Sequence, residues 1–490
     1  MNWIYYTILA VYSLTLVYIT FYCLMQFHLL YHYKKSKKNP QTPPPHIAEF
    51  PFVTIQLPVF NEMYVVERLI DCIMAMDYPR DCFEVQILDD STDETSDIIR
   101  AKVRQYSAQG FQIKHLHRSD RKGFKAGALK EGMKSVRGEF IAIFDADFLP
   151  RRDFLKSTLP YFQNQKTGVV QTRWEHLNEN YSLLTRLQAL QLNVHFTVEQ
   201  QGRSAGKYLL QFNGTAGIWR REAVETSGGW QADTLTEDLD LSIRAQLRGW
   251  EIVYLENVGS PAELPAEISG IKSQQFRWMK GGAETAKKML PAVWRSQLAF
   301  HQKLHTTLHL LASAIFLFVF VAGVLSVPLI FAMHQLEIES DIFTFFLAGW
   351  ISIITIYYAA NVENDLARQP YLKRFLKFIF LFPLFLGLSM GLSLHNSVAV
   401  LQGYLGKKSS FVRTPKFNLL NWEDSLKNRK YISGKFSWTT IMEGLLTIYF
   451  LGGIGAGLYF ENSSFLLFHS LFSFGYGTIF YYSVKHFGLK

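Results

Sequence analysis

The sequence predicts an α/β domain with a mostly parallel sheet, inserted between transmembrane helices that form an α-helical membrane region. Two observations lead to this fold class. Long apolar runs occupy residues 3–31 and much of the chain beyond residue 303. Between residues 50 and 290, short β-rich runs alternate with amphipathic stretches. Such alternation is typical of a mostly parallel sheet covered by helices.

The overall composition places part of the chain in lipid. Of the 490 residues, 49% are hydrophobic, 15% aromatic and 19% charged, which is too apolar for two or three soluble domains. The net charge of +9 does not indicate nucleic-acid binding, because basic residues cluster beside apolar runs, as at residues 34–38 and 407–408. This placement favours a cytoplasmic membrane face. The three cysteines lack the spacing of a disulfide framework or a zinc site, so a reducing compartment fits best.

The first apolar run predicts an N-terminal transmembrane anchor at residues 1–33. The run exceeds the roughly 20 residues that cross a bilayer, and it lacks the basic start of a signal peptide. Because basic residues follow the anchor and none precedes it, we expect the domain at residues 51–302 to lie in the cytosol. A Pro-rich linker at residues 34–50 joins the two, and residues 303–490 form a membrane domain.

The membrane domain contains apolar runs of two kinds. Plain spans are predicted at residues 309–333, 341–361, 438–458 and 465–484. A further run, at residues 376–402, is basic on both flanks and contains Pro383 and Asn396. Both of its ends favour the cytosolic side, which predicts an interfacial or re-entrant helix pair, with a plain span as the alternative. The C-terminus is then expected in the cytosol.

Polar and acidic residues follow the predicted strands of the α/β domain. The strands are expected near residues 52–57, 84–89, 112–116, 139–144 and 168–172. Parallel sheets bind ligands at the carboxyl ends of their strands. Glu62 and Asp90 come after the first two strands, where carboxylates can hydrogen-bond a nucleoside. For residues 91–93 alone, turn formers and helix caps are the better explanation.

The strand at residues 139–144 ends in a pair of acidic residues, Asp145 and Asp147. Two carboxylates one residue apart can hold a hard divalent cation, so this pair predicts a site for Mg²⁺ or Mn²⁺ that bridges to a diphosphate. Such a pair is weak by itself, because surface turns often produce it. Here it is the third acidic strand end in one sheet, which strengthens the prediction.

Two later segments carry side chains suited to group transfer. Glu237 and Asp238 begin a helix-like stretch, and a carboxylate there can take a proton from an attacking hydroxyl. Residues 274–278 (QQFRW) lie on a later helix, where the indole of Trp278 could stack on a sugar ring. Taken singly, a capping box at Thr236 and a membrane-interface tryptophan at Trp278 are the preferred alternatives.

Together these motifs resemble the family 2 glycosyltransferases of the processive, membrane-integrated type, which have a cytosolic GT-A catalytic domain. The D, DxD, TED and QxxRW series occurs in order between residues 50 and 290. Closer still, PVFNE, LDDSTDET, GFKAGALKEGM, FDADFLP, FNGTAGIWRR and TEDLDLSIRAQLRGW resemble plant mannan and glucomannan synthases of the cellulose synthase-like superfamily. Residues 406–418 are similar to the family's gating loop, FxVTxK, with Arg413 in place of its valine. Phe148 stands where cellulose synthases carry histidine.

The resemblance implies a role for each matching position. The residues that it places around the nucleotide sugar are Glu62, Asp90, Lys125, Asp145 and Gly214. Asp145 and Asp147 would bind the metal, and Asp238, beside Glu237, would be the catalytic base. The residues implied for the acceptor site and the diphosphate end are Gln274, Arg277 and Trp278. Those implied to close over the donor from the gating loop are Phe411, Thr414 and Lys416.

The resemblance also implies an activity, which is inverting transfer of a hexose from GDP-mannose or UDP-glucose to a growing β-linked polysaccharide that is secreted as it grows. A single-addition lipid glycosyltransferase of the glucosylceramide type is the alternative enzyme, because QxxRW occurs there too. A catalytically idle transporter or nucleotide-sensing scaffold is a rival of another class. The implied partners are the donor, a polysaccharide or glycolipid acceptor and the lipid bilayer of a plasma or Golgi-type membrane. Nucleic acid is not expected, because the candidate cleft is acidic.

Overall fold

The structure is a computed structural model of the whole chain. It describes residues 2–38, 44, 49–338, 343, 345–364, 369–409, 411–420, 424, 430–431 and 437–487. Much of the expected linker at residues 34–50, the start of the expected span at residues 341–361 and residue 410 of the expected gating loop lie outside the described residues.

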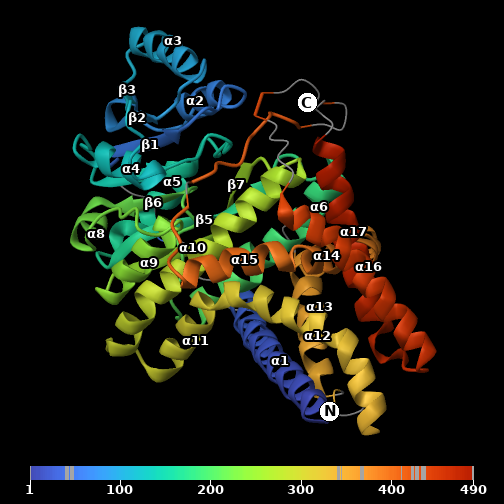
Figure 1. Cartoon of the computed structure of the whole chain (residues 1–490). Helices are drawn as coiled ribbons and strands as arrows, with labels where there is room; N and C mark the ends of the chain where they lie inside the picture. Colours follow the sequence, from blue (N-terminus) through green and yellow to red (C-terminus); the bar gives the residue numbers. More distant parts are fainter. Residues whose placement is uncertain are drawn as a thin grey trace.

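A seven-stranded sheet forms the centre of the α/β domain (Figure 1). Its strands are β1 Val53–Val59, β2 Phe83–Asp89, β3 Ile113–His117, β4 Phe140–Ile143, β5 Thr167–His176, β6 Gly217–Arg220 and β7 Glu251–Ala262. Their order is β3-β2-β1-β4-β6-β5-β7. Only β6 runs antiparallel to its neighbours, so the predicted mostly parallel sheet is confirmed. The sequence interpretation located β1 to β5 and missed β6 and β7.

The central strands are buried on both faces. Every residue of β2 (FEVQILD) is buried, as expected where helices cover a parallel sheet on both sides. Its polar residues are paired with β1 across the register: Gln56 donates a hydrogen bond to Gln86 (3.1 Å) and Thr54 to Glu84 (3.0 Å). These bonds satisfy polar groups that would otherwise be buried without a partner.

Helices cover both faces of this sheet and leave its strand ends free for a site. One hydrophobic core joins the sheet to α2 Val66–Met74, α3 Thr95–Ala108 and α5 Phe154–Thr158. A second core joins the other face to α4 Phe124–Met133, α8 Arg221–Thr226 and α9 Glu237–Leu247. After β5 come α6 Leu183–Val194, a π-helical turn at His195–Glu199 and α7 Gln200–Ala205.

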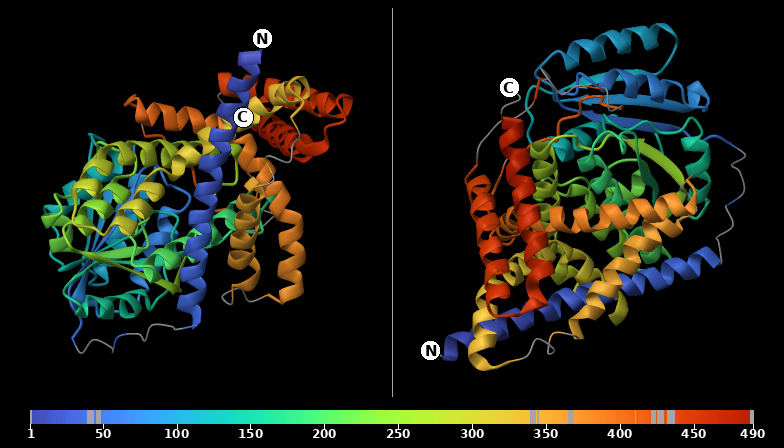
Figure 2. Two further views of the ribbon diagram at one scale, coloured as in Figure 1. Left: turned by 90° about the horizontal axis from the view of Figure 1, so that it is seen from below. Right: turned by 90° about the vertical axis from the view of Figure 1, so that its right-hand side faces the viewer.

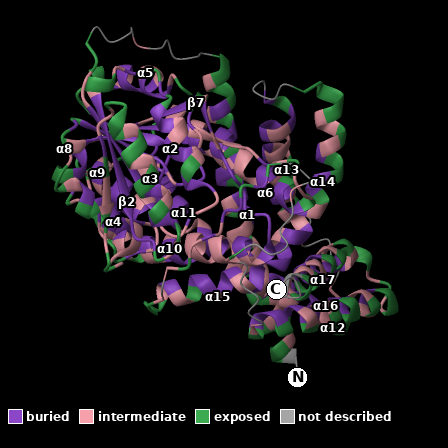
Figure 3. Ribbon diagram, turned by 90° about the horizontal axis from the view of Figure 1, so that it is seen from above, coloured by how far each residue is buried: buried purple, intermediate pink, exposed green. Residues whose placement is uncertain are grey.

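The remainder of the described chain is helical. Its helices are α1 Asn2–Lys38, α10 Ile268–Arg295, α11 Phe300–Leu310, α12 Ile315–Leu336, α13 Leu347–Tyr358, α14 Tyr371–Gly391, α15 Ser393–Tyr404, α16 Trp438–Tyr459 and α17 Leu466–Phe487. Among the described residues, four helices are long and apolar enough to cross a membrane: Trp3–Lys38, Ala312–Leu336, Tyr371–Gly391 and Trp438–Tyr459. Exposed residues line the outward faces of α14 and α16, among them Ile379, Phe380, Ile448 and Leu451 (Figure 3). Apolar side chains that face outward on such helices are suited to lipid contact.

The first helix connects the α/β domain to the other helices that are long and apolar enough to cross a membrane. We call these four helices (α1, α12, α14 and α16) and those packed among them the membrane-type helices. Tyr12 packs with α12 and lies 5.3 Å from the ring of Phe343, whereas Leu29 approaches α7 so closely that a Cβ at Gly202 would meet its carbonyl. Lys37 forms an ion pair with Glu256 of β7 (3.0 Å). Figure 2 shows this long helix running along the flank of the domain. The helix ends at Lys38, five residues beyond the expected anchor at residues 1–33.

The segment at residues 376–402 contains two helices, α14 and α15, which meet at Leu392. α15 lies along α10, where His395 contacts the Lys272 carbonyl (2.9 Å) and Gly403 packs on the backbone of Lys280. Because α14 is one of the four helices with the length and apolarity of a span, a re-entrant pair stays a prediction. α13 and α17, which occupy two expected spans, are not among those four.

Candidate active site

A cavity of about 190 Å³ opens at the carboxyl ends of the central strands and is the candidate active site. Its lining includes every site residue that the sequence predicts: Glu62, Asp90, Lys125, Asp145, Asp147, Gly214, Glu237, Asp238, Gln274, Arg277, Trp278, Phe411, Thr414 and Lys416. The fold thus brings together positions that are up to several hundred residues apart in the chain. Their individual roles stay predictions.

The acidic pair after β4 is surrounded by cationic side chains. Lys125 of α4 lies 2.5 Å from Asp145 Oδ1, and Lys416 lies 2.7 Å from Asp147 Oδ2. Because each carboxylate contacts an ammonium group, the pair stabilises positive charge at this position. Carboxylate oxygens are also the ligands that Mg²⁺ and Mn²⁺ prefer. The residues therefore fit a hard divalent cation, which would replace the lysines as the counter-charge.

A glycine allows the backbone to pass close to the proposed base. Gly214 has φ +79°, in the left-handed region that favours glycine, and a Cβ there would lie 3.0 Å from Asp238 Oδ2. Its carbonyl accepts a hydrogen bond from Lys125 (2.9 Å). The backbone of Gly214 therefore lies between Lys125 and Asp238, and the lack of a side chain leaves room for the Asp238 carboxylate.

Glu237 and Asp238 are the first two residues of α9, and both line the cavity. Burial, together with the adjacent Glu237 carboxylate, raises the pKa of Asp238 to about 7, and burial also raises the pKa of Glu237. Asp238 accepts a hydrogen bond from the amide of Leu239 (2.8 Å). The capping-box alternative does not hold, because the Thr236 side chain makes no capping bond and instead contacts the Thr285 hydroxyl (3.1 Å).

The QQFRW motif lies on α10 and faces the same cavity. Arg277 donates a hydrogen bond to the Thr414 hydroxyl (2.8 Å), and its guanidinium lies 4.6 Å from the centre of the Phe411 ring. Trp278 lines the cavity together with Gln274. α10 therefore supplies a cation and an aromatic side chain to the cavity wall.

The segment at residues 411–418 closes over the cavity through three acidic side chains. Lys416 pairs with Asp147, and Arg413 lies 2.8 Å from Glu62 in an ion pair. Glu263 accepts hydrogen bonds from the backbone amides of Phe417 (2.9 Å) and Asn418 (3.1 Å). Burial raises the pKa of Glu62 to about 8 although the Arg413 charge acts in the opposite direction. Ion pairing and backbone hydrogen bonds thus hold this segment across one side of the cavity.

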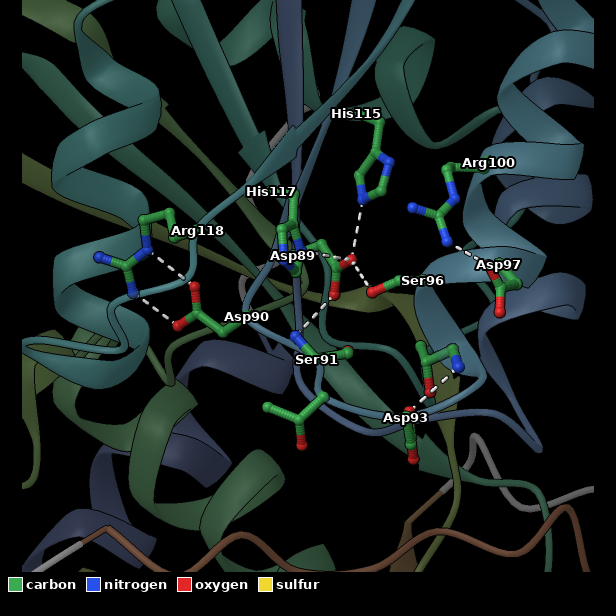
Figure 4. Close-up of polar contacts among 12 residues, drawn as sticks. Asp89, Asp90, Ser91, Asp93, Ser96, Asp97, Arg100, His115, His117 and Arg118 are labelled. Carbon is green, nitrogen blue, oxygen red and sulfur yellow. Dashed lines mark hydrogen bonds and ion pairs between the residues drawn. The ribbon is translucent and has the colours of Figure 1, made fainter.

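The end of β2 carries the residues expected at the nucleoside. Asp90 forms a two-point pair with Arg118, at 2.7 Å to Nε and 2.5 Å to Nη2 (Figure 4). Asp89 accepts a hydrogen bond from the Ser91 amide (2.8 Å), and Asp93 accepts one from the Thr95 amide (3.0 Å). These local bonds agree with the turn explanation for residues 91–93, whereas the N-cap of α3 is Glu94, which makes no side-chain capping bond.

Several lining residues were not found by sequence reasoning. Arg121 lies with its guanidinium 3.3 Å from the centre of the Phe60 ring, and Trp174 and Asn213 form part of the wall. The signal for Arg121 was present, because it stands four residues before Lys125 in the run RKGFKAG. Trp174 has no comparable signal, because β5 reads as an ordinary strand that ends beyond the expected boundary at residue 172.

A second cavity, of about 470 Å³, adjoins the first and extends among the membrane-type helices. The two cavities share Trp174, Asn213, Thr236, Asp238 and Trp278. The lining of the second cavity includes polar groups such as Glu199, which His195 contacts at 2.9 Å. It also includes large aromatic side chains such as Trp350 and Phe385. Asp238 and Trp278 therefore lie where the two spaces meet.

A GT-A sheet with acidic strand ends and a pair of carboxylates after β4 is typical of a glycosyltransferase. Residues 51–281 match the sequence profile of the "Glycosyltransferase like family 2" domain. Glucomannan 4-beta-mannosyltransferase 1 of Oryza sativa subsp. japonica is 38% identical over 394 residues, which cover 78% of this chain and 72% of that protein. The chain belongs to glycosyltransferase family 2 and is a hexosyltransferase.

Other similarities cover less of the relative or show the fold alone. Glucomannan 4-beta-mannosyltransferase 7 of Arabidopsis thaliana is 41% identical over 255 residues, which cover 51% of this chain and 46% of that protein. The chain thus matches about half the length of that relative. A mannosyltransferase from Pyrobaculum calidifontis, solved with GDP-Man and Mn²⁺, has a TM-score of 0.51 at 18% identity and covers 81% of this chain and 100% of its own. This structural likeness shows that the GT-A fold is shared.

Proposed function

We propose that this protein transfers mannose from GDP-mannose, with inversion, to the end of a growing β-linked polysaccharide at the membrane. The observation that carries this proposal is the position of Asp238. Its carboxylate lines both the donor cavity and the cavity that extends among the membrane-type helices. A general base for sugar transfer has to contact the acceptor on one side and the donor on the other, and Asp238 has this position.

The proposed reaction is a single in-line displacement. Asp238 takes the proton of an acceptor hydroxyl as its oxygen attacks the anomeric carbon of the α-linked donor. The bond to the nucleoside diphosphate breaks on the opposite face, so the new linkage is β. Arg277, whose guanidinium lies within the cavity, stabilises the charge that develops on the leaving diphosphate. A carboxyl with a pKa of about 7 is close to the ideal for proton transfer near neutral pH.

A divalent ion, Mg²⁺ or Mn²⁺, would be held by Asp145 and Asp147. Bound there, it would supply Lewis-acid stabilisation of the leaving diphosphate. Lys125 and Lys416, the present partners of these carboxylates, would then be free to contact phosphate oxygens. Lys416 belongs to the segment at residues 411–418, so its transfer from Asp147 to the donor would connect closure of that segment to donor binding.

The preference for GDP-mannose over UDP-glucose rests on the relatives. The rice and Arabidopsis proteins are glucomannan 4-beta-mannosyltransferases by name, and the Pyrobaculum enzyme was solved with GDP-Man. The lining of the donor cavity includes Asp90, which pairs with Arg118, and Arg121, and these charged groups could hydrogen-bond a base or ribose. UDP-glucose is the second donor that the proposal must be tested against.

The second cavity supports a glycan acceptor near Asp238. Gln211 and His195 of its wall, together with Glu199, offer hydrogen-bonding groups for sugar hydroxyls, and Trp278 offers an aromatic face. One observation favours a second candidate function. One part of the cavity wall, with Phe316, Trp350, Tyr357 and Phe385, is apolar and could hold a lipid chain. A single-addition lipid glycosyltransferase is therefore the alternative.

The test is transfer by the purified full-length protein in detergent, with radiolabelled GDP-mannose or UDP-glucose and Mn²⁺. We expect product from GDP-mannose that is insoluble in ethanol and in organic solvent and that a β-mannan-specific hydrolase digests. Asp238→Asn should abolish the product, while Asp153→Asn, a carboxylate outside both cavities, should not. Product that extracts into organic solvent would establish the lipid alternative. Transfer from UDP-glucose alone, or an active Asp238→Asn variant, would overturn the proposal.

The orientation in the membrane is part of the same proposal. The basic residues at positions 34–38 follow α1, and Lys407 and Lys408 precede the segment that closes the cavity. By the positive-inside rule both lie on the cytosolic side, with the α/β domain between them. A reporter that is active only in the cytosol, fused after Lys490, should be active; an inactive reporter would refute this arrangement.

A further inference from the structure

A second group of metal-ligating side chains lies outside the proposed donor-metal pair. β2 and β3 are parallel neighbours, and their register places Asp89 opposite His117. His115 precedes His117 by two residues and therefore projects from the same face of the sheet. His115 Nε2 lies 2.8 Å and His117 Nδ1 3.2 Å from Asp89 Oδ2. Figure 4 shows both imidazoles turned toward this carboxylate.

The charge around Asp89 differs from that of the other acidic residues at these strand ends. Asp90, Asp145 and Asp147 each pair with an arginine or a lysine. Within the described part of the chain, Asp89 pairs with the two histidines alone, although its side chain is fully buried. A buried carboxylate is stabilised by hydrogen bonds and by nearby positive charge. A cation held by the two imidazoles and Asp89 would supply such a charge.

We propose that Asp89, His115 and His117 bind a divalent transition-metal ion of the Zn²⁺ class. Their three ligand atoms lie within 4.8 Å of one another, so small side-chain movements would bring them around one ion. Two imidazoles and one carboxylate suit Zn²⁺ and its neighbours, whereas the carboxylate pair after β4 suits Mg²⁺ or Mn²⁺. The side chain of His117 is 45% exposed, which leaves a path for the ion and room for a water ligand.

The surroundings of Asp89 already have the arrangement that supports a metal ligand. Ser96 Oγ donates a hydrogen bond to Asp89 Oδ2 (2.6 Å), and the Ser91 amide donates one to Oδ1 (2.8 Å). Bonds of this kind fix the orientation of a coordinating carboxylate. Cysteine spacing, which is a common sequence sign of a zinc site, gives no indication of this group because it contains no cysteine. It arises because parallel pairing places an HxH strand beside an acidic strand end.

The ion would act on the donor site through its neighbours in the chain. Asp90 directly follows Asp89, Arg118 directly follows His117, and the two form the charged pair at the nucleoside end. An ion that joins the ends of β2 and β3 would therefore hold Asp90 and Arg118 at a fixed separation. We assign this site a positioning function, separate from the chemistry at Asp238.

The experiment measures metal binding directly and needs no donor. Full-length protein carrying a purification tag without histidine is stripped of metal and titrated with Co²⁺, whose visible absorption reports coordination, and with Zn²⁺ by calorimetry. The Asp147→Asn background removes the proposed donor-metal site. We expect one equivalent of Co²⁺ to bind, and His115→Gln and His117→Gln each to weaken it by more than about 100-fold, because even supporting partners contribute roughly 10- to 100-fold.

The controls separate loss of a ligand from loss of the fold. His301→Gln changes an exposed histidine outside the group and should bind Co²⁺ like the parent. Ser96→Ala keeps all three ligands and should weaken binding by roughly 10- to 100-fold. Metal should also raise the melting temperature of the parent and not that of His117→Gln. Absence of stoichiometric binding, or equal binding by parent, His115→Gln and His117→Gln, would overturn the proposal. Neither result would change the role proposed for Asp238, which the transfer assay tests separately.

Discussion

Replacing Asp238 with asparagine should lower activity and raise stability together, and the pH should set the size of the second effect. The asparagine keeps the shape of the side chain and cannot take a proton. Turnover should fall by roughly 10²- to 10⁴-fold, the usual contribution of positioned proton transfer. In the wild type, turnover should decrease about tenfold per pH unit below pH 7, because burial and Glu237 raise the pKa of Asp238 to about 7.

The stability effect follows from the same pKa. The folded pKa of about 7 lies above the ordinary aspartate pKa of 3.8, so the folded state binds the proton more tightly than the unfolded state. Between these two pH values the wild type loses stability as the pH rises. At pH 8 the ionised Asp238 costs at most about 4 kcal/mol, at 1.36 kcal/mol for each pKa unit. The asparagine variant avoids that cost and should be more stable at pH 8 and similar near pH 4.

Two assays decide this prediction. Release of nucleoside diphosphate is measured from pH 5 to 9, and thermal unfolding of both proteins is followed in detergent over the same range and at pH 4. The matched control is Asp153→Asn, which changes a half-exposed carboxylate outside the cavities. A flat pH profile for the wild type between pH 5 and 8, or an Asp238→Asn variant that is less stable than the wild type at pH 8, would refute the reasoning.

Three further substitutions test the donor side of the cavity. Asp147→Ala should lose Mn²⁺-dependent donor binding in calorimetry; unchanged Mn²⁺ dependence would remove Asp147 from the metal site. Lys416→Met should strengthen donor-free Mn²⁺ binding by roughly tenfold, because its ammonium no longer competes for Asp147 and a charged hydrogen bond contributes about 1.5 kcal/mol; equal Mn²⁺ affinity would contradict this. Gly214→Ala should lower stability by about 1–3 kcal/mol in thermal unfolding, because alanine is strained at φ +79° and its Cβ would crowd Asp238; a fully stable, active variant would show that the backbone can relax.

The acidic strand ends could be predicted because they depend on local pattern and on one general property of parallel sheets. Glu62, Asp90 and Asp145 follow strands whose apolar runs are readable in the sequence, and parallel pairing brings such ends to one edge. β6 (GIWR) was missed because its four residues mix a glycine and an arginine with two apolar residues, whereas the equally short β4 (FIAI) is a continuous apolar run. β7 was missed as well, and its pairing with β5 contains register shifts that interrupt regular strand alternation.

Pairs between distant segments could not be predicted from the sequence. Arg413 and Glu62 form an ion pair across most of the chain, and His115 meets Asp89 only through the register of β2 and β3. No local pattern encodes these distances, because they depend on how whole elements pack. The capping-box alternative failed for the same reason. A capping box at Thr236 is a local expectation, whereas packing of α10 turns that hydroxyl toward Thr285.

The charge of the cavity supports a metal-dependent donor. Its lining carries six carboxylates, Glu62, Asp90, Asp145, Asp147, Glu237 and Asp238, and five cationic side chains, Arg121, Lys125, Arg277, Arg413 and Lys416. A site with this balance is not positive enough to attract a diphosphate, whose two phosphates add further negative charge. Raised pKa values at Glu62 and Asp238 remove part of the repulsion, but the Asp145 and Asp147 pair directly faces the phosphates in the proposed reaction. A divalent ion at that pair changes the balance from repulsion to attraction, so donor binding should require the ion and should weaken as salt screens it.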